Sequence, residues 1–340
     1  MFRLKQSVIK PTFINWAASR RGLKQVVEKK VRFFITPQGR GLSFILLSAA
    51  TVVATNLKYI GPNGYLIDHV KEIYQRYTSD KPTQVSPRLQ KLINECMEDL
   101  ALSDQEKLLT KFIIGNVNEQ PTTFGYTHGH DGRVLIILPY FFNHESEENL
   151  DKQSVLEVNP NVSKLSEDSS EYKQFRNTLM LSDEAKKFAI ARELQRGLKG
   201  GYRLEAYLGV LSVCTNYILC RTTNNSLRLL HGSFYRRLSS YVSFGLAHCL
   251  FFLYSANLLK NSGDKELDGA TARISKSYAR GGAEFYLRET ARHLCIRQYV
   301  KTDEYDKYGD KVNMFLDHLP LKDRAAACQH IAALHDADLT

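Results

Sequence analysis

The chain has 340 residues, of which 43% are hydrophobic and 24% are charged, and its formal net charge is +10 at pH 7. Residues 1–40 hold ten Lys and Arg against one acid, Glu28, so almost all of the excess charge lies in this segment. A nucleic-acid binder carries its basic patch on the folded body, so this distribution argues against nucleic acid as a partner.

Residues 1–40 have the character of a mitochondrial targeting leader. They are rich in Arg, Lys and Ser, and apolar residues such as Phe2, Leu4 and Trp16 stand among the charges. A cationic, amphipathic segment that is poor in acids is typical of mitochondrial import. A basic cytosolic tail in front of a membrane anchor is the alternative interpretation.

Three apolar runs are candidates for membrane helices, at residues 41–57, 206–220 and 238–259. The third is long enough to cross a bilayer, whereas the second is marginal and also fits a buried or re-entrant helix. The predicted organisation is a leader (1–40), a first transmembrane helix (41–60), a soluble body (61–203), a membrane helix pair (204–259) with a basic loop (221–237), and a helical tail (260–340) that completes the body.

The distribution of arginine predicts how these segments are oriented. The loop 221–237 contains four arginines and no acid, so by the positive-inside rule it belongs on the matrix side, as does the leader. Three crossings satisfy both conditions. They place the body and the tail together in the intermembrane space.

Several local signals predict elements of the body. A helix should begin at Ser86 and Pro87, and a β-hairpin should occupy residues 122–139 with His128 and His130 near its turn. The acidic segment 143–172 indicates a solvated loop. Ser182 should cap a second helix, and the tail should begin with a polar stretch, 261–269, before its own helices.

The order of these elements is similar to that of membrane-bound zinc metallopeptidases, or zincins. In that class a hairpin edge strand precedes a helix with His-Glu-x-x-His, membrane helices follow, and a later helix supplies a Glu ligand. Here Arg192-Glu193-Leu194-Gln195-Arg196 stands where the zinc motif would be, and Glu284 stands where the third ligand would be.

Arginine at both histidine positions excludes zinc hydrolysis at this motif. A guanidinium is permanently charged and has no lone pair to donate, so Arg192 and Arg196 cannot bind a metal. Glu193 and Glu284 are expected to be neutralised by arginine instead. The six cysteines are scattered and lack the spacing of a zinc or redox site, so the sequence predicts no cofactor.

The sequence also resembles the transmembrane protein 177 family of mitochondria. The resemblance rests on residues 181–194 (LSDEAKKFAIAREL), residues 277–287 (SYARGGAEFYL), and residues 318–320 followed by Asp323 and Arg324. It covers the second half of the chain well and the first half mainly in its hydropathy profile. It implies an inner-membrane protein that associates with newly made cytochrome c oxidase subunit 2 and the dedicated assembly chaperone of that subunit.

We therefore expect an α+β fold: a mostly helical, membrane-anchored, degenerate zincin-like domain with a β-hairpin edge and three transmembrane helices. Its expected function is that of a non-enzymatic scaffold for assembly of the respiratory chain. An extended client segment would bind along the hairpin edge, at Val134, Leu135, Ile136, Ile137 and Leu138. The alternative is a membrane metallopeptidase with unusual ligands, for example His128, His130 and Glu284.

Overall fold

The structure, a computed structural model, describes residues 67–78, 80–116, 120–125, 132–145, 150, 152–199, 203–229, 234–312 and 319–337, together with positions 36, 39, 42, 46 and 50. The predicted leader and first transmembrane helix therefore lie almost entirely outside the described residues. His128 and His130 also lie outside them.

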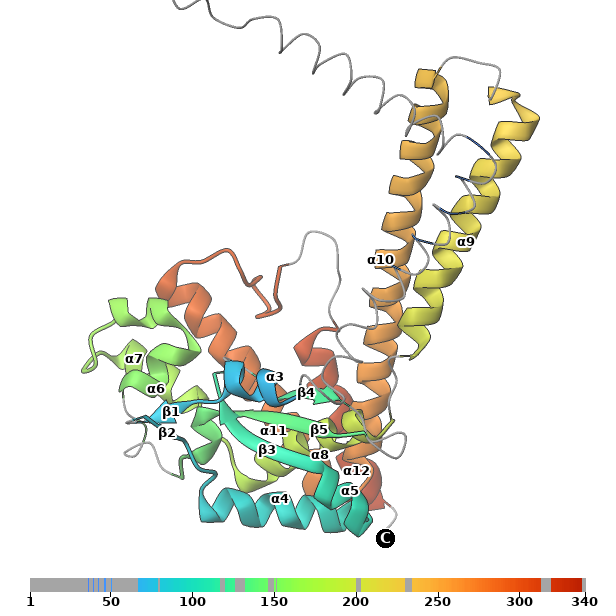
Figure 1. Cartoon of the computed structure of the whole chain (residues 1–340). Helices are drawn as coiled ribbons and strands as arrows, with labels where there is room; N and C mark the ends of the chain where they lie inside the picture. The colour runs from blue at the N-terminus through green and yellow to red at the C-terminus, as the bar shows by residue number, and fades with distance from the viewer. Residues whose placement is uncertain are drawn as a thin grey trace, which may run out of the picture.

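Two regions that are far apart in the sequence fold into one body. Helix α8 (Asp183–Lys199) packs against α11 (Lys276–Cys295), which in turn packs against α12 (Leu321–Ala337). Between them in sequence, α9 (Arg203–Ser226) and α10 (Phe234–Ala272) form a long hairpin that projects from this body (Figure 1). The predicted body and tail therefore lie at the same end of the hairpin.

A three-stranded sheet lies in the body, with strand order β3-β5-β4. Strand β4 (Thr122–Gly125) pairs antiparallel with β5 (Val134–Pro139), which confirms the predicted hairpin. Strand β3 (Thr110–Gly115), which the sequence analysis missed, pairs parallel with the other side of β5. A second, two-stranded sheet consists of β1 (Tyr77–Thr78) and β2 (Lys81–Pro82).

The central position of β5 corrects the predicted client-binding edge. Val134, Leu135, Ile136, Ile137 and Leu138 are each at most 1% exposed, and β5 is hydrogen-bonded on both sides. The prediction of an edge at these residues is wrong, because a continuous apolar run is what a strand buried on both faces requires. Strand β4 is the edge on this side of the sheet.

Successive side chains of β5 point to opposite faces of the sheet and join two separate hydrophobic clusters. Val134, Ile136 and Leu138 join the large cluster that contains the apolar faces of α8 and α11. Leu135 and Ile137 join a smaller cluster with Ile67 of α3 (Ile67–Tyr74) on the opposite face. The sheet therefore lies between α3 and the helical layer of α8 and α11 (Figure 1).

The predicted helix starts are confirmed. Ser86 accepts a hydrogen bond from the Leu89 amide at the start of α4 (Pro87–Asp99), and Ser182 accepts one from the Ala185 amide at the start of α8. Ser103 and Glu106 form a capping box at α5 (Asp104–Leu109).

The prediction of a solvated loop at 143–172 is wrong for most of its length. The segment starts at the last residue of η1 (Tyr140–Asn143) and contains α6 (Lys152–Val158), η3 (Pro160–Lys164) and the start of α7 (Ser170–Thr178). Apolar residues spaced among its acids are buried, including Leu150, Val155, Val158, Val162 and Tyr172. Of its acids, Glu145, Glu167 and Asp168 are exposed.

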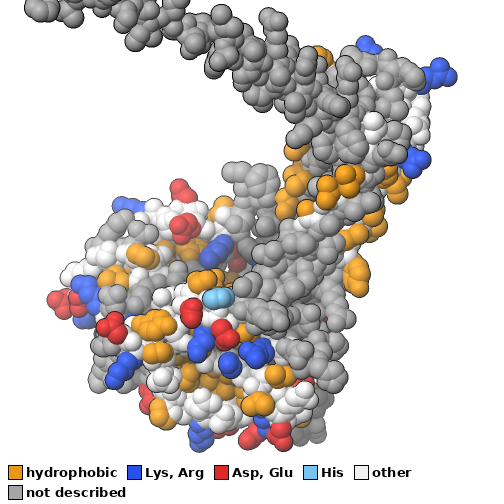
Figure 2. Space-filling model, viewed as in Figure 1, with side chains coloured by type: hydrophobic (Ala, Val, Ile, Leu, Met, Phe, Trp, Pro, Cys, Tyr) orange, Lys and Arg blue, Asp and Glu red, His pale blue; other side chains and the backbone are white. Residues whose placement is uncertain are grey.

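Helix α10 corrects the predicted polar stretch 261–269, because it continues without interruption to Ala272 and enters the body. Among the described residues, the segment Ser239–Ala272 is the one helix long and apolar enough to cross a membrane, and its apolar window is only 6% buried. Hydrophobic side chains gather along the hairpin, whereas the body shows acidic and basic side chains scattered among hydrophobic ones (Figure 2). Three transmembrane helices remain a prediction.

The π-helical turn η5 (Ile296–Val300) extends α11.

The close packing of α11 on α8 depends on Gly281. A Cβ atom added there would overlap the carbonyl oxygen of Glu184 and the amide of Ala185. Gly281→Ala should therefore lower the free energy of unfolding by about 1–3 kcal/mol, the usual cost of overpacking. The matched control is Gly263→Ala on α10, where nothing lies within 4 Å. Thermal unfolding of the purified full-length protein measures both, and equal unfolding temperatures would contradict this packing.

Candidate functional site

The middle of α8 carries Arg192, Glu193 and Arg196, the residues that the sequence analysis compared with a zinc motif. Arg192 is 4% exposed and Glu193 is 1% exposed, while Arg196 is partly buried. The hydroxyl of Thr123 on β4 donates to Glu193 Oε2 at 2.8 Å, and it also lies 3.1 Å from the backbone oxygen of Glu193. The central turns of α8 therefore lie directly against the edge strand of the sheet.

The guanidinium of Arg192 is surrounded by carboxylates. Its Nε donates to Asp268 Oδ1 at 2.7 Å. Its Nη1 donates to Glu193 Oε1 at 2.7 Å, and its Nη2 donates to Asp264 Oδ1 at 3.0 Å. Burial acts to lower the pKa of Arg192, but Tyr286 and the three carboxylates outweigh it and raise that pKa well above its ordinary value. Arg192 is therefore a fixed cation.

Asp268 of α10 is held from its other side by α12. Arg324 donates to it through Nε at 2.6 Å and through Nη2 at 2.8 Å. The hydroxyl of Tyr286 on α11 donates to Asp268 at 2.7 Å and accepts from Arg324 at 2.5 Å. Burial raises the pKa of Tyr286 well above its ordinary value, so the phenol remains a neutral donor.

Arg196 completes the cluster. Its Nη2 donates to Asp264 at 2.6 Å and lies 3.6 Å from Glu193 Oε1. Three guanidinium groups thus face three carboxylates, and the ionic charges balance. We call this set the arginine-carboxylate network; its members are Arg192, Glu193, Arg196, Asp264, Asp268, Tyr286 and Arg324.

The network holds its charges in place and offers no group for metal chemistry at the motif. Arg192 and Arg196 have no lone pair, and Glu193 already accepts hydrogen bonds on both oxygens. A nearby thiol, Cys328, has its pKa raised to about 12, mainly by burial and further by Asp268. It is therefore protonated at neutral pH and is neither a nucleophile nor a metal ligand there.

Glu284 lies elsewhere, which corrects the expectation that it shares a site with Glu193. Its carboxylate accepts from the backbone amide of Ser182 at 3.1 Å and from the Ser182 hydroxyl at 2.5 Å. Ser182 is the cap of α8, so Glu284 stabilises the positive end of that helix. Arg192 lies ten residues further along α8, about 15 Å away by helical rise.

The alternative metal set is only partly described. His128 and His130 lie outside the described residues, and Glu284 is engaged with Ser182. Within the described ranges, no three His, Cys, Asp or Glu side chains are grouped in a way that could hold a metal ion.

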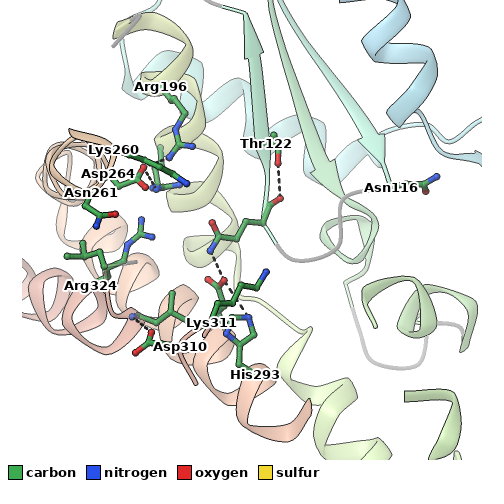
Figure 3. Close-up of a pocket in the computed structure, with 15 residues that line it drawn as sticks. Asn116, Thr122, Arg196, Lys260, Asn261, Asp264, His293, Asp310, Lys311 and Arg324 are labelled. Carbon is green, nitrogen blue, oxygen red and sulfur yellow. Dashed lines mark hydrogen bonds and ion pairs between the residues drawn. The ribbon is translucent and has the colours of Figure 1, made fainter. Parts of the chain in front are cut away.

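A cavity of about 560 Å³ opens beside the network. One wall is the base of α10, with Lys260 and Asp264, and Arg196 faces it from α8 (Figure 3). The other wall is formed by Gln120 and Thr122 at the start of β4, by Glu289 and His293 of α11, and by Asp310 and Lys311 of the following loop. Volumes of this size accommodate small ligands or peptide side chains.

Sequence reasoning missed Asp264, Asp268, Tyr286 and Arg324. Asp264 and Asp268 stand four residues apart, a spacing that places two carboxylates on one helix face. That signal was available, but it required α10 to continue through the polar stretch. Tyr286 and Arg324 were visible only as parts of the segments that carry the family resemblance.

Comparison with known proteins gives a consistent result. The sequence model of the family described as Transmembrane protein 177 matches residues 34–320. Transmembrane protein 177 of Danio rerio is 27% identical over 280 residues, covering 81% of this chain and 86% of that protein. The human protein of the same name is 26% identical, with 74% and 78% covered, and that of Xenopus laevis is 25% identical, with 84% and 90% covered. No solved structure matches.

The fold and the site define a membrane protein with a mostly helical α+β body, in which ion-paired arginines occupy the centre. The family match spans most of the described residues and every member of the network except Arg324. The chain belongs to the Transmembrane protein 177 family.

Asp268 is the member of the network that bridges two buried guanidinium groups. Asp268→Asn should lower the free energy of unfolding by about 3–5 kcal/mol, because Arg192 and Arg324 would remain buried without a full counter-charge. The control is Asp183→Asn, which removes an exposed pair with Arg88 and should cost at most about 1 kcal/mol. Both are measured by denaturant unfolding of the purified protein. Similar losses in the two variants would show that the network does not stabilise the body.

Proposed function

We propose that this chain is a non-enzymatic scaffold of the mitochondrial inner membrane, which assists the assembly and stability of cytochrome c oxidase subunit 2 together with the assembly chaperone of that subunit. The proposal joins membership of a transmembrane protein family to the basic leader and to the resemblance in residues 181–194 and 277–287. It assigns the protein a stoichiometric binding role.

The observation that supports a non-enzymatic role best is the pairing of Arg192 with three carboxylates. A peptidase of the zincin class would need imidazole nitrogens and a free general base at this point of α8. Here the base position, Glu193, is bonded to Arg192 and Thr123. We infer a zincin-like layout that has kept its shape and exchanged its metal for an internal ion cluster.

We place the client-binding edge on β4. A strand at the end of a sheet offers unpaired backbone groups, and an extended peptide can add to it by β-augmentation. β4 is such an end strand, and Thr122 lines the cavity beside it. Leu135 and its neighbours on β5 would support this edge from behind.

We propose that α9 and α10 cross the inner membrane as a pair and that a further crossing precedes the body. Apolar side chains on both helices are exposed, for example Leu211 and Ile218 on α9 and Leu246 and Phe251 on α10. Such a surface is suited to lipid or to the membrane helices of a client. The body would then lie in the intermembrane space, and the loop 221–237 in the matrix.

Client contact at β4 is tested by photo-crosslinking in intact mitochondria. A benzoylphenylalanine in place of Thr122 should capture newly synthesised cytochrome c oxidase subunit 2. The same group in place of Leu108, which is 81% exposed on α5, is the matched control. Mass spectrometry identifies the captured protein. If neither crosslinking site recovers that subunit and affinity isolates also lack it, the assigned client is refuted. Stoichiometric zinc in the purified protein would favour the metallopeptidase.

Protease protection tests the orientation. In mitochondria whose outer membrane has been opened, added protease should digest epitopes attached to the body, such as one after residue 340. An epitope within the loop 221–237 should stay protected until the inner membrane is dissolved. The opposite pattern would place the body in the matrix and exclude the proposed orientation.

A further inference from the structure

Glu289 of α11 is a buried carboxylate in which the described residues give a hydrogen bond to only one of the two oxygen atoms. It is 2% exposed, and it lines the cavity beside β4. Its Oε1 accepts from Gln120 Nε2 at 2.5 Å, while its Oε2 has no hydrogen-bond partner among the described residues. A buried carboxylate without a full set of donors is unfavourable, because it has lost its hydration.

Among the described residues, no lysine or arginine forms an ion pair with Glu289, and Lys311 of the same cavity wall is exposed. Gln120 is an uncharged donor. The Nε2 atom of His293 lies 3.9 Å from Glu289 Oε1, beyond hydrogen-bond length. The other ring nitrogen of His293 lies 2.7 Å from the carbonyl of Gly309 and must be the donor in that bond.

The cations across the cavity are committed to other acids or lie at its mouth. Arg192 and Arg196 are bonded to Asp264, and Arg324 is bonded to Asp268. Lys260 is exposed at the base of α10. Glu289 Oε2 is therefore a buried acceptor in the cavity wall that can bond to a donor from a ligand.

The position of Glu289 relative to β4 suggests how a ligand would reach it. Gln120, which holds Glu289, lies two residues before Thr122, the first residue of β4. Gln120 and Thr122 line the same cavity as Glu289. Thr122 is labelled in Figure 3. A peptide added along the outer edge of β4 would pass this point, and a long side chain from it would enter the cavity.

We propose that this cavity binds an ammonium group, supplied by a lysine side chain or a free amino terminus of an extended peptide on β4, with Glu289 Oε2 as its anionic acceptor. The proposal rests on the scaffold function proposed above and specifies the chemistry of its client. A primary ammonium offers three donors, and one of them can bond to Oε2 of Glu289. An ammonium also supplies the positive charge that Gln120 lacks.

The test uses the full-length protein in lipid nanodiscs and short fluorescent peptides of alternating threonine and valine. The central residue is lysine, glutamine or glutamate, and both ends are blocked. A fourth peptide has a free amino terminus and glutamine at its centre. Fluorescence polarisation gives the dissociation constants. The lysine peptide should bind at least about tenfold more tightly than the glutamine peptide, as expected for a hydrogen-bonded charge. A gain by the fourth peptide would assign the site to amino termini.

Glu289→Gln should reduce the lysine preference to about onefold and leave binding of the glutamine peptide unchanged. Glu304→Gln, an exposed carboxylate in the loop after α11, is the matched control and should keep the preference. If Glu289→Gln fails to fold, Glu289→Asp retains the charge, and the comparison of peptides on the unaltered protein still decides.

Equal binding of the lysine and glutamine peptides, or tighter binding of the glutamate peptide, would overturn the proposed ammonium site. Absence of binding by all four peptides would overturn it as well. Equal binding would leave the scaffold function standing, because the β4 edge would still hold an extended chain. The crosslinking to the oxidase subunit decides that function separately.

Discussion

The fold depends on the bonds that Asp268 makes within the body. This one carboxylate accepts from Arg192 of α8, Arg324 of α12 and Tyr286 of α11. Buried ions are tolerated only where their desolvation is offset by complete pairing. Because Asp268 belongs to α10, the same bonds fix the base of the helical hairpin to the body. The direction in which the apolar hairpin leaves the body is therefore set by an ion cluster as well as by apolar packing.

The same cluster determines what the centre of the protein can do. An imidazole pair at Arg192 and Arg196 would leave lone pairs and a titratable proton, whereas guanidinium groups leave neither. The carboxylate of Glu193 is held by Arg192 and Thr123 and is not available as a base. Arg192 and Glu193 instead hold α8 against α10 and against the edge strand. What remains open is the cavity next to them, whose wall contains Glu289.

The sequence predicted those features that local chemistry determines. Ser86 and Ser182 cap their helices as expected, and the hairpin forms because its turn and strands are contiguous. Long-range pairings were missed. Strand β3 pairs with β5 across many intervening residues, and Asp268 meets Arg324 only after α11 has folded back. The motif comparison located Arg192 and Glu193 but misplaced Glu284, since spacing along a chain does not fix which turn of a neighbouring helix a residue meets.

The cavity also lies at a particular position along α10. The apolar run of α10 ends at residue 259, and Lys260 and Asp264 of the next turn line the cavity. Helical rise places these two residues about 6 Å apart, so the cavity begins where the apolar surface ends. If α10 crosses the membrane as proposed, a client helix packed on it would bring its first extended residues to this cavity, which Thr122 of β4 also lines. Since a lysine at a helix end reaches for the polar interface, the flanking residues of a membrane helix are the kind that Glu289 would accept.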